Sequence, residues 1–239
     1  MLEVFAAFAR AVSDLTRGGL WFHALWPSLV SISLWGLIGV LGWPAGTAWL
    51  GGVLPTLPWS GWQWLTDWAA GFLYLCALAP LAYFTTVLLI GAVALPRMMT
   101  VVAARHYADV LPHGSMTSAI WGGIVNTLKA SLIYVGGWLL SLPLLLIPGA
   151  LLVLPILWTA WMNQRSFRFD ALAEHATAAE MTILFRRRAG NLRLAGIATA
   201  LLTYVPIVNL IAPALAALVF VHLCLGALRR LRQEEGITL

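Results

Sequence analysis

Residues 194–228 read LAGIATALLTYVPIVNLIAPALAALVFVHLCLGAL and contain no Asp, Glu, Lys or Arg. Three other stretches are equally free of these charges: 18–66, 68–96 and 130–164. A helix crosses the ~30 Å hydrocarbon core of a bilayer with ~20 apolar residues, so each stretch is long enough to span it. The pattern therefore predicts an all-α integral membrane protein.

The composition of the whole chain excludes the other broad classes. Of 239 residues, 61% are hydrophobic and 10% are charged, and the mean hydropathy is +0.88. Soluble domains are ~45–50% apolar and ~25% charged, and disordered chains are more polar still. The two cysteines, Cys76 and Cys224, lie apart in apolar runs. They indicate neither a disulfide framework nor a metal or redox site.

Two of the charge-free stretches predict long transmembrane helices. We expect one at 20–42 and another at 68–96, the second extended to about residue 111. The region 43–68, where they meet, contains three prolines and six tryptophans. Tryptophan favours the headgroup level, so this segment is interpreted as an aromatic belt and interfacial loop. The alternative is that the tryptophans fill a protein core.

The remaining two stretches, 130–164 and 194–228, have 35 residues each, too long for one helix and slightly short for two full spans with a turn. Helix-breaking or polar residues interrupt both near the middle: Pro143, Pro148, Gly149, Pro155, Pro206, Asn209 and Pro213. Paired interrupted segments are typical of broken helices around a polar path. We therefore expect two helical hairpins that partly penetrate the bilayer. The candidate pore or break residues are Pro148, Gly149, Pro206, Asn209 and Pro213. Plain spanning hairpins with prolines in their turns are the alternative.

The charge distribution predicts which segments face the cytosol. All fourteen Lys and Arg residues fall in 1–17, 97–129, 165–193 and 229–232, whereas 43–67 has none. Basic loops are retained in the cytoplasm. The four basic segments are therefore expected inside and 43–67 outside, which requires each hairpin to return to the side it entered.

Two of the basic segments have amphipathic patterns. Residues 1–17 place apolar side chains on one helical face and predict an interfacial helix: Phe5, Phe8, Val12 and Leu15. The segment 165–193 is expected to be cytosolic and amphipathic. Within it, Asp170 and Glu174 are spaced i, i+4. We interpret them as part of a solvated charged face, with a divalent metal site as the alternative.

Signals for catalysis are absent from the sequence. It contains no zinc-protease, nucleophile-elbow, Walker or dinucleotide motif. We expect no enzyme activity, no cofactor, no metal and no nucleic-acid partner. His222 lies inside the final apolar stretch, where an ionisable group has either a structural or a functional role.

Anion binding has better support. Gly18 and Gly19 precede a long apolar helix and follow Arg17. The free N–H groups and positive dipole end of a helix start favour an anion, and an arginine adds charge-assisted hydrogen bonds. Arg17, Gly18, Gly19 and Leu20 are therefore the candidate anion site.

Two C-terminal motifs carry a family resemblance. Residues 169–175 read FDALAEH, and residues 203–213 read TYVPIVNLIAP, with Glu180 and an arginine run at 186–188 between them. This pattern resembles the CysZ family of bacterial inner-membrane sulfate permeases, also called the etoposide-induced-protein-like family.

The resemblance implies two long transmembrane helices and two partly penetrating hairpins in the bacterial inner membrane. It also implies sulfate conduction for cysteine synthesis and a homo-oligomer in which dimers build a hexamer. The family has two arginines directly after its Gly-hydrophobic motif, whereas this chain has Trp21 and Phe22. Sulfate would then contact Arg17, Gly18, Gly19 and Leu20. The alternative function is a membrane-organising or accessory protein that keeps the fold without transporting.

Overall fold

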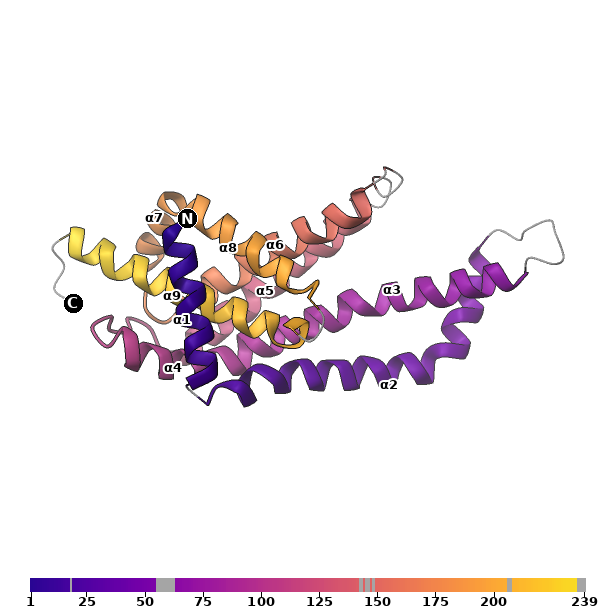
Figure 1. Cartoon of the computed structure of the whole chain (residues 1–239), viewed down its shortest axis with the longest axis horizontal. Coiled ribbons are helices and arrows are strands. Elements are labelled where there is room, and N and C mark those ends of the chain that lie inside the picture. The colour runs from indigo at the N-terminus through magenta and orange to yellow at the C-terminus, as the bar shows by residue number, and fades with distance from the viewer. Residues whose placement is uncertain are drawn as a thin grey trace. The chain divides into compact units, whose positions relative to one another are not determined.

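The computed structural model describes residues 1–17, 19–54, 63–141, 144, 147, 149–205 and 208–235. These residues form helices and turns, and none of them lies in a strand. In chain order the elements are α1 (Leu2–Arg17), α2 (Trp21–Val53), α3 (Gln63–Leu89), the π-helical turn η2 (Ile90–Ala94), α4 (Leu95–His106), α5 (Met116–Ser141), α6 (Ala150–Asp170), α7 (Ala178–Arg187), α8 (Ala189–Leu202) and α9 (Val208–Glu234) (Figure 1). The prediction of an all-α fold is confirmed.

Within the described residues, three helical segments are long and apolar enough to cross a membrane. They are Trp21–Val53, Gln63–His106 and Val208–Glu234. Only 28% and 29% of the first two apolar windows are buried inside the protein, against 83% of the third. The first two therefore expose apolar surface, as a lipid-facing helix does, whereas α9 is covered by other helices. The chain is a multi-pass membrane protein.

The helices are longer than the sequence patterns predicted near the tryptophan-rich segment. α2 continues to Val53 instead of ending near residue 42, and α3 already begins at Gln63. Pro44 lies inside α2, because one missing N–H does not break a long apolar helix whose other amides stay paired. Of the tryptophans, Trp43, Trp49, Trp64 and Trp68 are exposed, which contradicts the core-filling alternative. Trp59 and Trp62 lie outside the described residues.

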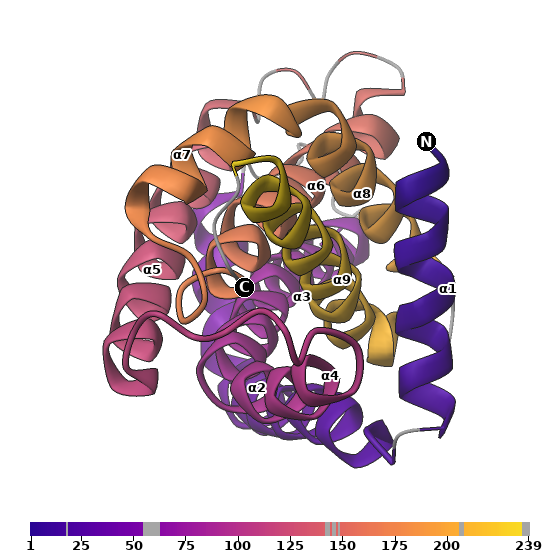
Figure 2. The ribbon, with the colours of Figure 1, turned by 90° about the vertical axis from the view of Figure 1, so that its left-hand side faces the viewer.

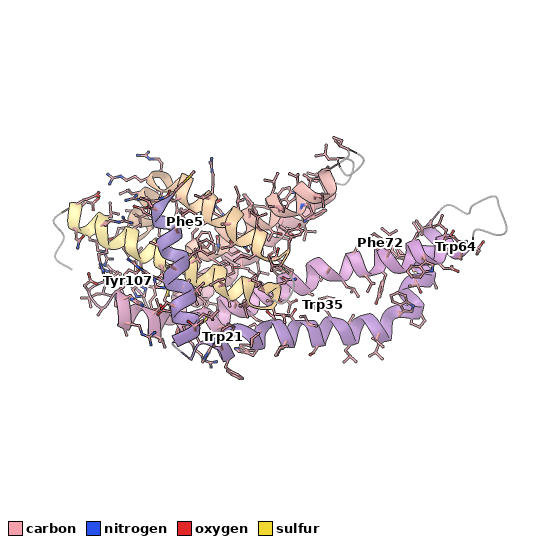
Figure 3. The ribbon with its side chains drawn as sticks, in the orientation of Figure 1. Phe5, Trp21, Trp35, Trp64, Phe72 and Tyr107 are labelled. Atoms are coloured by element: carbon pink, nitrogen blue, oxygen red, sulfur yellow. The ribbon has the colours of Figure 1, made fainter. Side chains whose placement is uncertain are left out.

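Residues Ser28–Val87 form one compact unit, an antiparallel pair made from most of α2 and α3. Polar side chains bond across the pair in its apolar surroundings. The Ser31 hydroxyl donates to the carbonyl of Ala82 at 2.6 Å. The indole N–H of Trp35, labelled in Figure 3, donates to the Thr85 hydroxyl at 2.9 Å. Such interhelical hydrogen bonds hold helices together where lipid removes the hydrophobic driving force.

Met1–Pro27 and Leu88–Leu239 form the other compact unit, which is built around α9. Figure 2 shows α9 seen nearly end-on, with α1 on one side and α6 and α8 on another. Nearly every residue of α9 from Ala212 to Leu228 is buried. α6 and α8 approach closely at Gly196, where an added Cβ would lie 2.6 Å from the carbonyl oxygen of Ala160.

α1 has two apolar faces with different surroundings. The face that packs in the unit is buried and consists of Val4, Ala7, Ala11 and Leu15. Two members of the predicted membrane face, Phe5 and Val12, are exposed, and Phe5 is labelled in Figure 3. The helix forms where the sequence predicted it, but small alanines on a neighbouring stripe make its protein contact because they allow close approach.

Ion pairs join the four basic segments within this unit. Glu3 of the first segment pairs with Arg188 of the third at 3.2 Å and with Arg230 of the fourth at 2.6 Å. Asp14 of the first pairs with Arg105 of the second at 3.1 Å. Further pairs connect α9 to its neighbours: Asp109–Arg229 and Glu180–Arg232. The segments that the charge rule assigned to one side of the membrane are thus neighbours in the fold.

Candidate functional site at the α1–α2 junction

The candidate anion site lies where α1 ends and α2 begins. Gly19 adopts a left-handed conformation, with φ +66°, which a glycine accepts without strain. Leu20 is buried, and α2 starts at Trp21. The amide of Ala24 donates to the carbonyl of Leu20 at 3.0 Å. The N–H groups of the residues just before Ala24 are therefore those that a helix start leaves without an intrahelical acceptor. Gly18 and the side chain of Arg17 lie outside the described part of the structure.

A buried acid lies one turn before this junction. Asp14 is on the last turn of α1, and its side chain is 3% exposed. Its Oδ1 accepts from the Arg105 guanidinium at 3.1 Å and lies 3.0 Å from His106 Nε2. Its Oδ2 lies 3.0 Å from Nε2 of His222 on α9. Three side chains from two other helices therefore hold the end of α1.

Tyr107 extends this network on the side away from Asp14. Its hydroxyl lies 3.2 Å from Nδ1 of His222 and 3.1 Å from the His222 carbonyl oxygen. The Arg229 guanidinium stacks over the Tyr107 ring, 4.9 Å from its centroid, and also donates to the His106 carbonyl at 2.6 Å. We call Asp14, Arg105, His106, Tyr107 and His222 the Asp14 cluster. Figure 3 labels Tyr107 beyond the end of α4.

The electrostatics of the Asp14 cluster favour a charged carboxylate. Burial pushes the pKa of Asp14 upward, but hydrogen bonds from His106 and Arg105 and the charges of His106 and His222 outweigh it, so the pKa lies below its usual value. A carboxylate that accepts several hydrogen bonds is stabilised in its ionised form. The cluster can therefore fix the direction of α1, and with it the start of α2.

A protein-family model described as Sulfate transporter CysZ/Etoposide-induced protein 2.4 matches residues 7–213, from α1 to the first turns of α9. The chain belongs to this family. It is thus a membrane protein of a sulfate-transporter family, and that family is one of transporters rather than enzymes. A comparison with curated proteins finds no match.

Two aromatic residues stand at the start of α2, where the motif of the CysZ family has two arginines. Trp21 and Phe22 begin α2 and are both exposed, Phe22 by 72%. Figure 3 labels Trp21 at this helix start. Neither side chain supplies a positive charge, so the cations near the junction come from Arg17 in the sequence and from α4 in the fold.

The predicted break residues are distributed over two helix junctions. Gly149 has φ +84° and caps the start of α6. Asn209 is exposed in the first turn of α9, where its backbone amide donates to the carbonyl of Val205 at 3.0 Å. Pro213 is buried inside α9. Pro148 and Pro206 lie outside the described residues. Among the described residues, these break positions are therefore not part of the α1–α2 junction.

Sequence reasoning singled out only His222 from the Asp14 cluster. Arg105, His106 and Tyr107 follow the second long span as an ordinary basic juxtamembrane stretch, and Asp14 resembles any acid on an interfacial helix. Asp14 and His222 are 208 residues apart. The one available signal was an ionisable group inside an apolar stretch, which requires a partner from elsewhere in the chain.

The expectation of a solvated Asp170–Glu174 face is wrong for Asp170. α6 ends at Asp170 and the next residues form a turn, so an i, i+4 helical pair does not form. Asp170 is buried, at 8% exposure. Among the described residues, no group of three or more His, Cys, Asp or Glu side chains is arranged to hold a metal ion.

Proposed function

We propose that this chain conducts sulfate or a closely related oxyanion across the bacterial inner membrane and so supplies sulfate for cysteine synthesis. The observation that carries the proposal is the sulfate-transporter family match, which includes the α1–α2 junction. The resemblance further supports a homo-oligomer in which dimers build a hexamer.

The chemistry of the junction fits a dianion. A dianion that leaves water requires several donors and at least one compensating charge, because an unpaired ion is strongly destabilised there. The helix start contributes backbone N–H groups, and Arg17 contributes the charge. Asp14 lies three residues before Arg17, but Arg105 and two histidines already bind its carboxylate. Its repulsion of an incoming anion is therefore reduced.

Replacing Arg17 with alanine is expected to weaken sulfate binding about tenfold or more, since one charge-assisted contact contributes ~1.5–3 kcal/mol. Isothermal titration of the purified protein with sulfate at fixed ionic strength measures the change. Lys129→Ala is the matched control, because Lys129 is also basic but is exposed on α5, away from the junction in the sequence. Constant ionic strength matters because screening alone mimics a weak effect.

Equal sulfate affinity in the wild type and Arg17→Ala would move the site away from the junction. Labelled-sulfate uptake into proteoliposomes then tests the function itself. If the protein binds sulfate without taking it up, or shows neither binding nor uptake, the accessory role is favoured over transport.

We also propose that 43–67 is the extracytoplasmic segment and that the basic segments face the cytosol. Single cysteines placed at Ser60, Ser115, Ala178 and Gln233 are expected to react with an impermeant thiol reagent in intact cells only at Ser60, after Cys76 and Cys224 are replaced by alanine. The ion pairs between the basic segments support a common side for the other three positions. Labelling at Ala178 would contradict the arrangement of returning hairpins.

A further inference from the structure

Asp170 occupies an unusual position at the end of α6. Its carboxyl lies against two glycines, Gly91 in the π-helical turn η2 and Gly123 in α5. A Cβ added to Gly123 would lie 2.8 Å from Oδ1 of Asp170, and one added to Gly91 would lie 3.0 Å from Oδ2. The two glycines therefore leave room for this carboxyl, which would have to shift if either residue had a side chain.

One oxygen of the carboxyl lacks a hydrogen-bond partner in the described part of the structure. That oxygen is Oδ1 of Asp170, which is buried. A small cavity of about 20 Å³ lies beside it, which is large enough for one water molecule. Its lining includes Gly91, Pro96, Gly123 and Glu174. An ionised, unpaired carboxylate in such a place would be strongly destabilising.

The π-helical turn, whose Gly91 lies against this carboxyl, has a backbone carbonyl without a helical donor. The amide of Leu95 donates to the carbonyl of Ile90. The next carbonyl in that register, that of Gly91, would need the N–H of Pro96, which proline does not have. A carbonyl without a helical donor can accept a hydrogen bond from a carboxylic acid. Single π-helical turns occur frequently at functional sites for this kind of reason.

The charged groups around Asp170 do not replace a proton. Glu174 is the only other titratable side chain that lines the cavity among the described residues, and its charge has the same sign. The basic side chains of the neighbouring elements are exposed or contact other groups. Arg97, Lys129 and Arg165 are exposed, and Arg168 stacks on Phe185. Arg105 and His106 bind Asp14, whereas His113 and His175 lie beside Arg232.

We propose that Asp170 is a proton-binding site: its carboxyl holds one proton at neutral and acidic pH and releases it to water as the pH rises. When protonated, the O–H donates to the Gly91 carbonyl and joins α6 to η2. When the proton leaves for the cavity water, the carboxylate draws further water into the cavity and loosens α6 from η2 and α5. Consistent with this geometry, burial raises the pKa of Asp170 to about 7.

The expected pH dependence follows from the direction of this shift. Because the folded protein holds the proton more tightly than the unfolded chain, stability is greatest below the usual carboxyl pKa of about 4. The contribution of Asp170 to stability falls as the pH rises from about 4 to about 7, and it does not change further above pH 7. Most carboxylates that form ion pairs show the opposite trend.

Thermal unfolding of the full chain in detergent, measured from pH 4.5 to 8.5, tests the proposal. We expect Tm of the wild type to fall relative to Asp170→Asn by roughly 5 °C or more between pH 4.5 and 7.5, since asparagine keeps the shape and remains neutral. Glu174→Gln is the matched control and is expected to retain the wild-type profile. Parallel profiles for the wild type and Asp170→Asn would overturn the proposal, as would a flattened profile in Glu174→Gln alone.

Two further measurements keep the test decisive. If Asp170→Asn does not fold, the titration of ¹³C-labelled aspartate carboxyls in the wild type is expected to show one group that titrates near pH 7. The absence of such a group would overturn the proposal. The second measurement compares Tm at pH 8 in sodium chloride with Tm in choline chloride at equal ionic strength, to test whether a metal cation binds in place of the proton. A sodium-specific rise in Tm that Asp170→Asn lacks would show that the ligand is a metal cation instead of a proton.

Discussion

An Asp14→Asn variant is expected to unfold at a temperature about 6 °C or more below the wild type, because breaking a buried ion pair from one side costs about 3–5 kcal/mol. The Asp14 side chain is 3% exposed and contacts Arg105, His106 and His222 at 3.0–3.1 Å. Asparagine fills the same volume but carries no charge. Differential scanning fluorimetry of the purified protein measures the loss.

Arg105→Gln is the control for this prediction, because it removes one partner of Asp14 and leaves both histidines. The Arg105 side chain is 42% exposed, so its loss is expected to destabilise the protein by only about 1 kcal/mol. The pKa of Asp14 lies below its usual value, so its stabilising effect is present above about pH 4 and is lost as the pH falls through the folded pKa. The gap between the wild type and Asp14→Asn should therefore shrink under acid conditions. A constant gap down to pH 3, or a Tm equal to that of the wild type, would contradict the role of the Asp14 carboxylate.

The second large effect is expected at Glu180. Its carboxylate accepts from Arg232 Nε at 2.8 Å, and the two side chains are 11% and 4% exposed. Arg232 also donates to the carbonyl of His175 at 2.6 Å. Glu180→Gln is therefore expected to destabilise the protein by about 3–5 kcal/mol, because it leaves a buried guanidinium without its counter-charge.

Glu180 has a second role that this substitution preserves. It closes a capping box at the start of α7, in which the Thr177 amide donates to Oε2 at 2.7 Å and the Glu180 amide donates to the Thr177 hydroxyl at 3.3 Å. Glutamine also serves at this position of a capping box. The measured loss therefore reports on the ion pair rather than on the cap.

The same pair of helices offers an internal comparison. Glu234 of α9 pairs with Arg187 of α7 at 3.3 Å, but its side chain is 60% exposed and that of Arg187 is 56% exposed. Glu234→Gln is expected to change stability by about 0–1 kcal/mol. Equal losses in Glu180→Gln and Glu234→Gln, measured by urea or thermal unfolding, would contradict the importance of burial.

Much of the helix pattern was predictable from single stretches of sequence. Lipid offers no partner for backbone N–H and C=O groups, so an apolar, charge-free stretch has to be helical. A helix was predicted at 1–17 and an interruption at Pro206, and α1 (Leu2–Arg17) and the start of α9 at Val208 agree with these two positions. The prediction was wrong at the end of α2, because Pro44 and the tryptophans around it were interpreted as a loop although the helix continues to Val53.

What the sequence by itself determined was the class of the protein, the approximate positions of its helices and the basic segments. Only the tertiary structure decided that Asp14 meets His222 across 208 residues and that Asp170 is buried between two glycines. The physical reason is that helical periodicity shows which residues share a face but not which helix that face contacts. In a chain with so few charges, the contacts of Asp14 and Asp170 depend on helix-to-helix packing, which joins segments far apart along the chain.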